Sequence, residues 1–168
     1  TDGDVIVVGI PNDDSCGAGV DPRDDEASCS TTGAVEILER DGAEWRRAVR
    51  IKADFPGTLD VFGSAVAVAA GGVYVGAPGE ASCGTGANED PDDDGCPRAG
   101  AVFAYEKRAG TWALVDFRKA SFVQAGQRFG AAVAATGDRL WVGVSADGSC
   151  EADDPAGTGC FESGRVEI

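Results

Sequence analysis

The chain has 168 residues, of which 29 are acidic and 14 basic, and its formal net charge is −15. Such a surface repels nucleic-acid phosphates and anionic headgroups, so we expect no nucleic-acid partner. Hydrophobic residues make up 43% of the chain, enough for a packed core. No apolar run approaches the about 20 residues of a membrane helix, so no membrane insertion is expected. The negative charge favours cations or basic proteins, or serves solubility alone.

The predicted elements repeat with a period of 67 residues. Gly9 recurs as Gly76 and Gly143, and Phe62-Gly63 recurs as Phe129-Gly130. A fixed period in unrelated residue types indicates a repeat architecture, in which each unit needs a neighbour to cover its second face. We predict about two and a half repeats, namely residues 1–60 (lacking the first strand), 61–127 (complete) and 128–168 (truncated).

Each complete repeat predicts four short strands. In residues 62–69, large residues alternate with glycine and alanine, which is typical of a strand with one crowded face, such as the innermost strand of a propeller blade. Asp41-Gly42 and Ala109-Gly110 fit the hairpin turns between the third and fourth strands. In chain order, the predicted strands are residues 5–10, those beginning at 33 and 45, 62–69, 73–77, those beginning at 100 and 112, 129–135, 140–144 and 164–168.

These patterns predict an all-β fold, a partial β-propeller built of four-stranded antiparallel blades. Propellers close with roughly four to eight blades, more than this chain supplies. Both ends fall within or beside strand-like runs, so we expect a fragment whose remaining blades belong to the same parent chain. An ordinary β-sandwich is the alternative, and the constant period argues against it.

The pattern of Phe62-Gly63 followed by Gly76-Ala77-Pro78 resembles the signature of FG-GAP repeats. The first and third copies carry weaker forms, Gly9-Ile10-Pro11 and Gly143-Val144-Ser145. The resemblance covers essentially the whole chain. It implies one blade per repeat and an extracellular adhesion or recognition module, as in integrin α-subunit heads and bacterial surface proteins.

This resemblance has one departure. Integrin-like blades often bind calcium in a loop between their first two strands, and calcium takes six to eight oxygen ligands. Here the corresponding connections, residues 70–72 and 136–139, hold at most one carboxylate each. That calcium cage is therefore absent from these two connections.

The cysteines fall as one pair in each repeat, bracketing the connection between the second and third strands. A zinc or iron–sulfur site is disfavoured, because the chain has no CxxC spacing and no histidine. Closing each loop with a disulfide contributes about 3 kcal/mol in the chain-entropy model. Disulfides imply an extracellular, cell-surface or periplasmic location. The predicted pairs are Cys16 with Cys29, Cys83 with Cys96, and Cys150 with Cys160.

The bridged loops are long and acidic, and loops on a rigid β scaffold often carry recognition. Asp90, Asp92, Asp94 and Gly95 read D-x-D-x-D-G, an alternation that can direct successive carboxylates at calcium. Ala101 stands where an EF-hand needs its bidentate glutamate, and the other copies break the pattern. The alternating aspartates make calcium the candidate cofactor. The competing interpretation is a solvated loop without a ligand.

No catalytic residue is predicted. The chain has no histidine, which excludes Ser-His-Asp and Cys-His sites within it, and no GxxxxGK phosphate loop. Trp45, Trp112 and Trp141 fit packing between blades better than a sugar-stacking platform. We predict a non-catalytic adhesion or recognition propeller that binds a protein or glycan ligand through its stapled acidic loops. The alternative is an accessory or catalytic propeller domain of a secreted carbohydrate- or lipid-acting enzyme.

Overall fold

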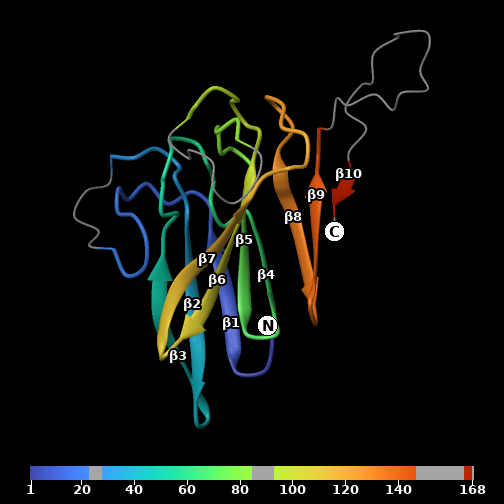
Figure 1. Cartoon of the computed structure of the whole chain (residues 1–168). Coiled ribbons are helices and arrows are strands. Elements are labelled where there is room, and N and C mark those ends of the chain that lie inside the picture. The colour runs from blue at the N-terminus through green and yellow to red at the C-terminus, as the bar shows by residue number, and fades with distance from the viewer. Residues whose placement is uncertain (23–27, 85–92, 147–164, 168) are drawn as a thin grey trace, which may run out of the picture.

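The computed structural model describes residues 1–22, 28–84, 93–146 and 165–167 (Figure 1). Within these residues the regular secondary structure consists of strands, arranged in three antiparallel sheets. The prediction of an all-β fold is therefore confirmed. No helix in the described part of the chain is long and apolar enough to cross a membrane.

The three sheets follow one another along the chain, and in each of them sequence neighbours pair side by side. Sheet 1 contains β1 (Val5–Ile10), β2 (Ala34–Asp41) and β3 (Glu44–Ile51). Sheet 2 contains β4 (Ala65–Ala69), β5 (Gly72–Ala77), β6 (Ala101–Arg108) and β7 (Thr111–Arg118). Sheet 3 contains β8 (Phe129–Thr136), β9 (Arg139–Val144) and β10 (Arg165–Glu167).

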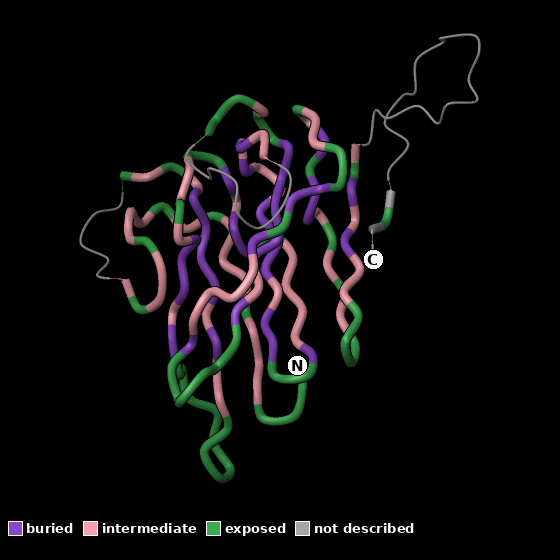
Figure 2. The backbone as a smooth tube through the Cα atoms, in the orientation of Figure 1, coloured by how far each residue is buried: buried purple, intermediate pink, exposed green. Residues whose placement is uncertain are grey.

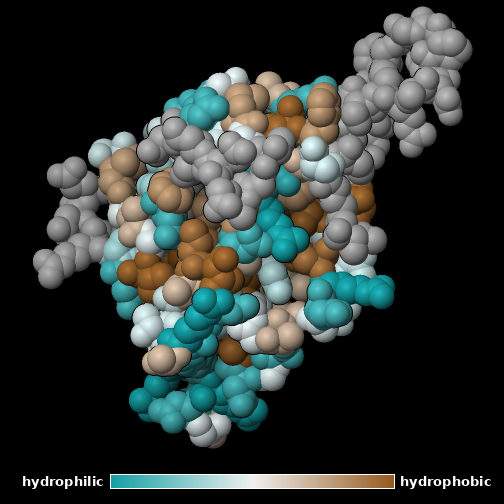
Figure 3. All heavy atoms as spheres, viewed as in Figure 1, coloured by the Kyte–Doolittle hydropathy of each residue, from teal (hydrophilic) through white to brown (hydrophobic). Residues whose placement is uncertain are grey.

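The two ends of the sheets differ in their connections (Figure 1). Tight turns lie at one end, and the turn residues Ala109 and Gly110 have φ angles of 50° and 87°, as a type I′ hairpin requires. The described parts of the longer connections, residues 11–22, 28–33, 52–64, 78–84, 93–100 and 119–128, lie at the opposite end, termed the loop end. Hydrophilic residues gather at the end with the tight turns, whereas apolar residues show over the middle of the face in Figure 3.

The first strand of the complete repeat is shorter than residues 62–69. It begins at Ala65, and Phe62 donates its backbone N–H to the carbonyl of Thr32 in the preceding unit, at 3.0 Å. Gly63 then adopts a φ of 91°, a left-handed conformation that suits glycine. Phe62-Gly63 is thus a turn that joins two sheets rather than the start of a strand.

Glycines let neighbouring sheets approach through their backbones. A Cβ on Gly76 would lie 2.0 Å from the carbonyl oxygen of Gly130, and a Cβ on Gly9 would lie 2.0 Å from that of Gly63. Real Cβ atoms do not come so close, so the backbone contact needs glycine at both positions. The 67-residue glycine period therefore marks the contact between successive sheets.

Two hydrophobic clusters fill the spaces between the sheets (Figure 2). The larger joins sheets 1 and 2, with Phe62 packed edge-on against Phe103 at 5.2 Å between ring centroids. Trp112 is buried there, and its Nε1 donates to Glu39 of sheet 1 at 3.0 Å. Trp45, at the same repeat position, is 39% exposed, because no described sheet covers its face. Packing between sheets is confirmed for Trp112, whereas for Trp45 it stays a prediction.

Candidate functional site

Two of the three predicted disulfides lie in the described part of the chain. Cys16 bonds to Cys29 and Cys83 bonds to Cys96, each with Cα atoms 5.0 Å apart. Cys150 and Cys160 lie outside the described residues, so their pairing stays a prediction. The two disulfides indicate an oxidising compartment.

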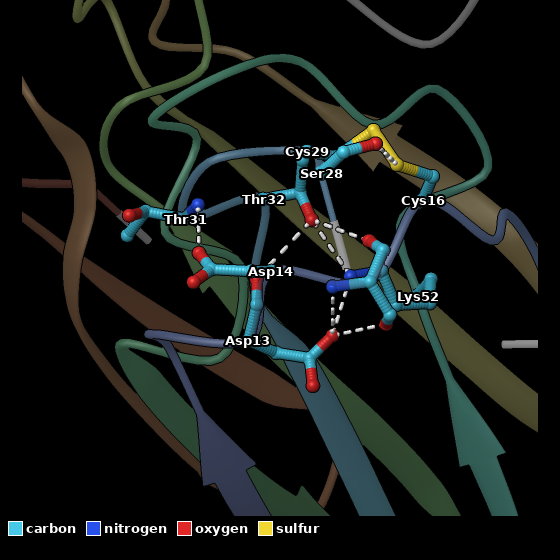
Figure 4. Close-up of a disulfide and its surroundings, with 9 residues drawn as sticks. Asp13, Asp14, Cys16, Ser28, Cys29, Thr31, Thr32 and Lys52 are labelled. Carbon is cyan, nitrogen blue, oxygen red and sulfur yellow. Dashed lines mark hydrogen bonds and ion pairs between the residues drawn. A yellow bond between two sulfur atoms is a disulfide. The ribbon is translucent and has the colours of Figure 1, made fainter. Parts of the chain in front are cut away.

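A buried ion pair lies beneath the first disulfide (Figure 4). The side chain of Lys52 is fully buried and donates to Asp13 Oδ1 and to Thr32 Oγ1, both at 2.7 Å. The Ser15 hydroxyl and the Arg50 guanidinium also donate to Asp13. Burial would raise the pKa of Asp13, but the hydrogen bonds from Lys52, Ser15 and Arg50 together hold it well below its usual range. The base of the first stapled loop is therefore anchored by a charge cluster in which Lys52, Ser15 and Arg50 all donate to Asp13.

A second ion pair stands 67 residues further along. The buried Lys119 binds Glu80 Oε2, and the backbone N–H of Ser82 donates to Glu80 Oε1 at 2.9 Å. Burial lowers the pKa of Lys119, and Glu80 acts in the opposite direction. Sequence analysis missed both pairs, although their members share the repeat period that revealed the cysteines.

An acidic cleft opens beside this second pair, at the loop end. It has a volume of about 240 Å³ and lies between the connection from β3 to β4 and the connection from β5 to β6. Its wall includes Phe55, which is 42% exposed. The residues that line it are Asp54, Phe55, Pro56, Gly57, Asp60, Glu80, Ala81 and Asp94.

Among the carboxylates of this cleft other than Glu80, which is paired with Lys119, Asp60 is the most deeply buried, with 3% of its surface exposed. The backbone N–H of Gly57 donates to its Oδ2 at 2.6 Å. Burial raises the pKa of Asp60 to about 6; Gly57 opposes this rise, Glu80 and Asp94 add to it, and Lys119 opposes it. A carboxyl group that titrates near neutral pH therefore lines the cleft.

Asp54 shares this environment. Burial raises its pKa, while the hydroxyl of Tyr105, which donates to Asp54 Oδ1 at 3.2 Å, opposes the rise. Because burial also keeps the Tyr105 hydroxyl protonated, with its pKa well above the ordinary value, that donor remains in place at all physiological pH values. The cleft thus holds two carboxylates whose ionised forms are disfavoured by burial.

The next repeat builds the same connection without these charges. Ser121 stands at the position of Asp54, and Gln127 at that of Asp60. The side-chain oxygen of Gln127 accepts the backbone N–H of Gln124 at 3.1 Å, as Asp60 accepts that of Gly57. The architecture therefore requires a hydrogen-bond acceptor at this position and not a charge.

The predicted calcium residues are only partly described. Asp94 is exposed and lines the acidic cleft, whereas Asp90 and Asp92 lie outside the described residues. Across the described ranges, no three His, Cys, Asp or Glu side chains are placed to hold a metal ion. Calcium binding by this loop stays a prediction.

Comparison with known proteins adds no family assignment. No model of a protein family matches the chain, and no curated protein matches it significantly. The resemblance to FG-GAP repeats rests on the residues of the chain itself.

Proposed function

We propose that the chain is the recognition part of an extracellular FG-GAP-type β-propeller, and that its acidic cleft binds a cationic group of a protein ligand. Three sheets that pack in series through repeated Phe-Gly and glycine contacts support the propeller architecture, whose other blades come from the parent chain. The disulfides support a location outside the cell, on its surface or in a periplasm.

The buried carboxylate of Asp60 is the single observation that supports a cationic ligand. An ionised carboxylate buried in this cleft costs stability, while the amide of Gln127 serves the same backbone contact in the next repeat. A charge that the fold does not need and that destabilises it is typical of a functional site. An ammonium or guanidinium group entering the cleft would offset the repulsion between Asp60, Glu80 and Asp94.

The exposed ring of Phe55 fits the same class of ligand. A cation over an aromatic face gains about 0.5–1 kcal/mol at exposed sites. Carboxylates on one wall and an aromatic ring on another give a lysine or arginine side chain both a charge partner and an apolar contact for its stem. We therefore expect a basic segment of a protein rather than a bare metal ion to fill the cleft.

The test is isothermal titration of the chain with a short peptide of lysine and glycine at low ionic strength. Asp60→Asn should weaken binding about tenfold or more, since a hydrogen bond to a charged group contributes about 1.5–3 kcal/mol. Asp138→Asn, which removes an exposed carboxylate from the turn between β8 and β9 at the opposite end, should leave the affinity unchanged. Equal loss in both variants would reduce the effect to net charge and contradict the site.

A secreted enzyme remains the second candidate because of one property of Asp60. General acids in glycoside hydrolysis are carboxyl groups whose pKa is raised by burial, and the pKa of Asp60, about 6, lies in that range. Turnover of an oligosaccharide by the wild-type chain that Asp60→Asn abolishes would favour this candidate over recognition.

A further inference from the structure

A second hollow at the loop end differs in charge from the acidic cleft. It has a volume of about 300 Å³, near the lower bound of small-ligand pockets. Its lining combines aliphatic and basic side chains: Leu59, Val61, Pro78, Gly79, Arg98 and Arg128. We propose that this basic pocket binds a carboxylate carried beside an apolar side chain, as in an acidic peptide segment that contains leucine.

The two arginines supply the charge for this ligand. Both are exposed, and neither side chain makes a hydrogen bond or ion pair within the described ranges. By contrast, Arg46, Arg47 and Arg118 each contact a carboxylate. In a chain with 29 acidic residues, two neighbouring arginines that contact no carboxylate among the described residues leave a local positive charge. A guanidinium group binds a carboxylate through two parallel hydrogen bonds, which makes the carboxylate the matching anion.

The backbone places these two side chains next to each other. The N–H of Arg128 donates to the carbonyl of Arg98 at 2.9 Å, so the two residues lie in adjacent segments of the backbone at the junction between sheets 2 and 3. Both have positive φ angles, 59° for Arg98 and 58° for Arg128. The junction therefore holds the backbones of the two arginines side by side, so both side chains start from neighbouring positions before any ligand arrives.

The apolar wall of the pocket explains why a bare anion is not the expected ligand. Leu59 is 52% exposed and is one of the few large aliphatic residues on the described surface. Val61 and Pro78 continue the apolar lining beside it. Covering these side chains with an apolar group of the ligand removes their surface from water and adds to the charge interaction.

The first inter-sheet junction shows that the fold does not need these arginines. Thr31 stands at the position of Arg98 and Val61 at that of Arg128, with φ angles of 53° and 50°. The N–H of Val61 donates to the carbonyl of Thr31 at 3.1 Å, the same bond that joins the two arginines. Arg98→Thr and Arg128→Val therefore place residues that this backbone already accommodates in its other copy.

The basic pocket and the acidic cleft lie on either side of one segment. Leu59 and Val61 line the pocket, whereas Asp60 between them lines the cleft. The basic pocket can therefore be tested with a ligand of opposite charge and with variants that leave Asp60, Glu80 and Asp94 untouched. The outcome is independent of whether the acidic cleft binds a cationic group.

The experiment is fluorescence anisotropy of the chain with a fluorescein-labelled peptide of leucine and glutamate, at low ionic strength. The Arg98→Thr/Arg128→Val double variant should bind about tenfold more weakly or worse, because both charge-assisted contacts are lost. Arg46→Thr, which removes an exposed arginine of β3 near the tight-turn end, should bind like the wild type. Thermal unfolding of each variant checks that the fold is retained, and the two single substitutions serve if the double variant is unstable.

Three results would overturn the proposal. These are no binding of the leucine–glutamate peptide by the wild-type chain, equal binding of a matched leucine–glutamine peptide, and undiminished binding by the double variant. A glucuronate-containing disaccharide, used as a competitor, distinguishes an acidic sugar from a peptide. Displacement of the labelled peptide by the disaccharide at a lower concentration than by the unlabelled peptide would also overturn the proposal.

Discussion

Two segments of equal length, residues 52–61 and 119–128, lie in the connections between successive sheets of this protein and have the same backbone contacts and opposite charge. The N–H of Gly79 donates to the carbonyl of Asp60, and the N–H of Ala146 donates to that of Gln127, both at 3.1 Å. The first connection carries Asp54 and Asp60, whereas the second carries neutral residues at both positions and ends in Arg128. Backbone hydrogen bonds thus define the junction, and the side chains decide what it can bind.

The two connections also begin with unequal ion pairs. Around Lys52, Thr32 accepts a second hydrogen bond and Arg50 shares the carboxylate of Asp13. Around Lys119, Ala99 replaces the threonine and Phe117 replaces the arginine. The second pair is therefore less well satisfied than the first, and it is the pair that borders the acidic cleft.

Replacing the lysine of each ion pair should give the largest difference in lost stability between the two connections. Lys119→Met leaves Glu80 buried without its partner, which costs about 3–5 kcal/mol in comparable cases. Lys52→Met should cost less, about 1–3 kcal/mol, because Arg50 and Ser15 still bind Asp13. Denaturant unfolding of the two variants under oxidising conditions measures both losses. A larger loss for Lys52→Met would mean that the additional donors do not compensate.

Removing the charge of Asp60 should stabilise the protein in a pH-dependent manner. Its folded-state pKa, about 6, lies above its ordinary value of 3.8, so the protonated form favours folding. This contribution is fully present below about pH 4 and is lost as the pH rises through 6. Asp60→Asn should therefore match the wild type at pH 4 and exceed its stability by up to about 3 kcal/mol at pH 8.

Gln127→Glu provides the reciprocal control for this prediction. It introduces a carboxylate at the equivalent buried position of the next repeat and should destabilise the protein at pH 8 but not at pH 4. Unfolding curves at the two pH values measure both variants. A flat difference between Asp60→Asn and wild type across this range would show that Asp60 does not titrate as described.

The sequence was sufficient to predict an all-β chain of repeated antiparallel sheets, because its signals are periodic. Glycine and Phe-Gly positions recur every 67 residues, as do the cysteines of the first two units, and in the described residues they mark backbone contacts or disulfides. The start of the first strand in the complete repeat was missed, whereas the matching strand of the next repeat begins at Phe129, as predicted. Ile51 and Arg118 occupy the same repeat position but differ in polarity, because Ile51 is buried in the cluster between sheets 1 and 2 while Arg118 is exposed.

The candidate sites were harder to predict, because they depend on where the repeats differ. Asp60 is unusual only in comparison with Gln127, its counterpart in the next repeat, and Arg128 only in comparison with Val61. This comparison is informative only when the two junctions are known to have the same backbone hydrogen bonds. The acidic loops drew attention through their composition, yet the carboxylate with the pKa of about 6 lies in the connection between sheets. Burial and neighbouring charge, which no linear pattern records, single out this residue.

The smallest expected effect concerns Thr32, the residue that distinguishes the surroundings of the two lysines. Thr32→Ala converts the first pair to the composition of the second, removing an acceptor for Lys52 and the hydrogen bond from Thr32 Oγ1 to the carbonyl of Ser15, which is 3.1 Å long. The loss should be about 1 kcal/mol, since Asp13 still binds the ammonium group. A double-mutant cycle with Lys52→Met isolates the Lys52–Thr32 contact from the bond to Ser15. A coupling near zero would show that the threonine acts only through the loop backbone, and the difference between the two ion pairs would then lie with Arg50.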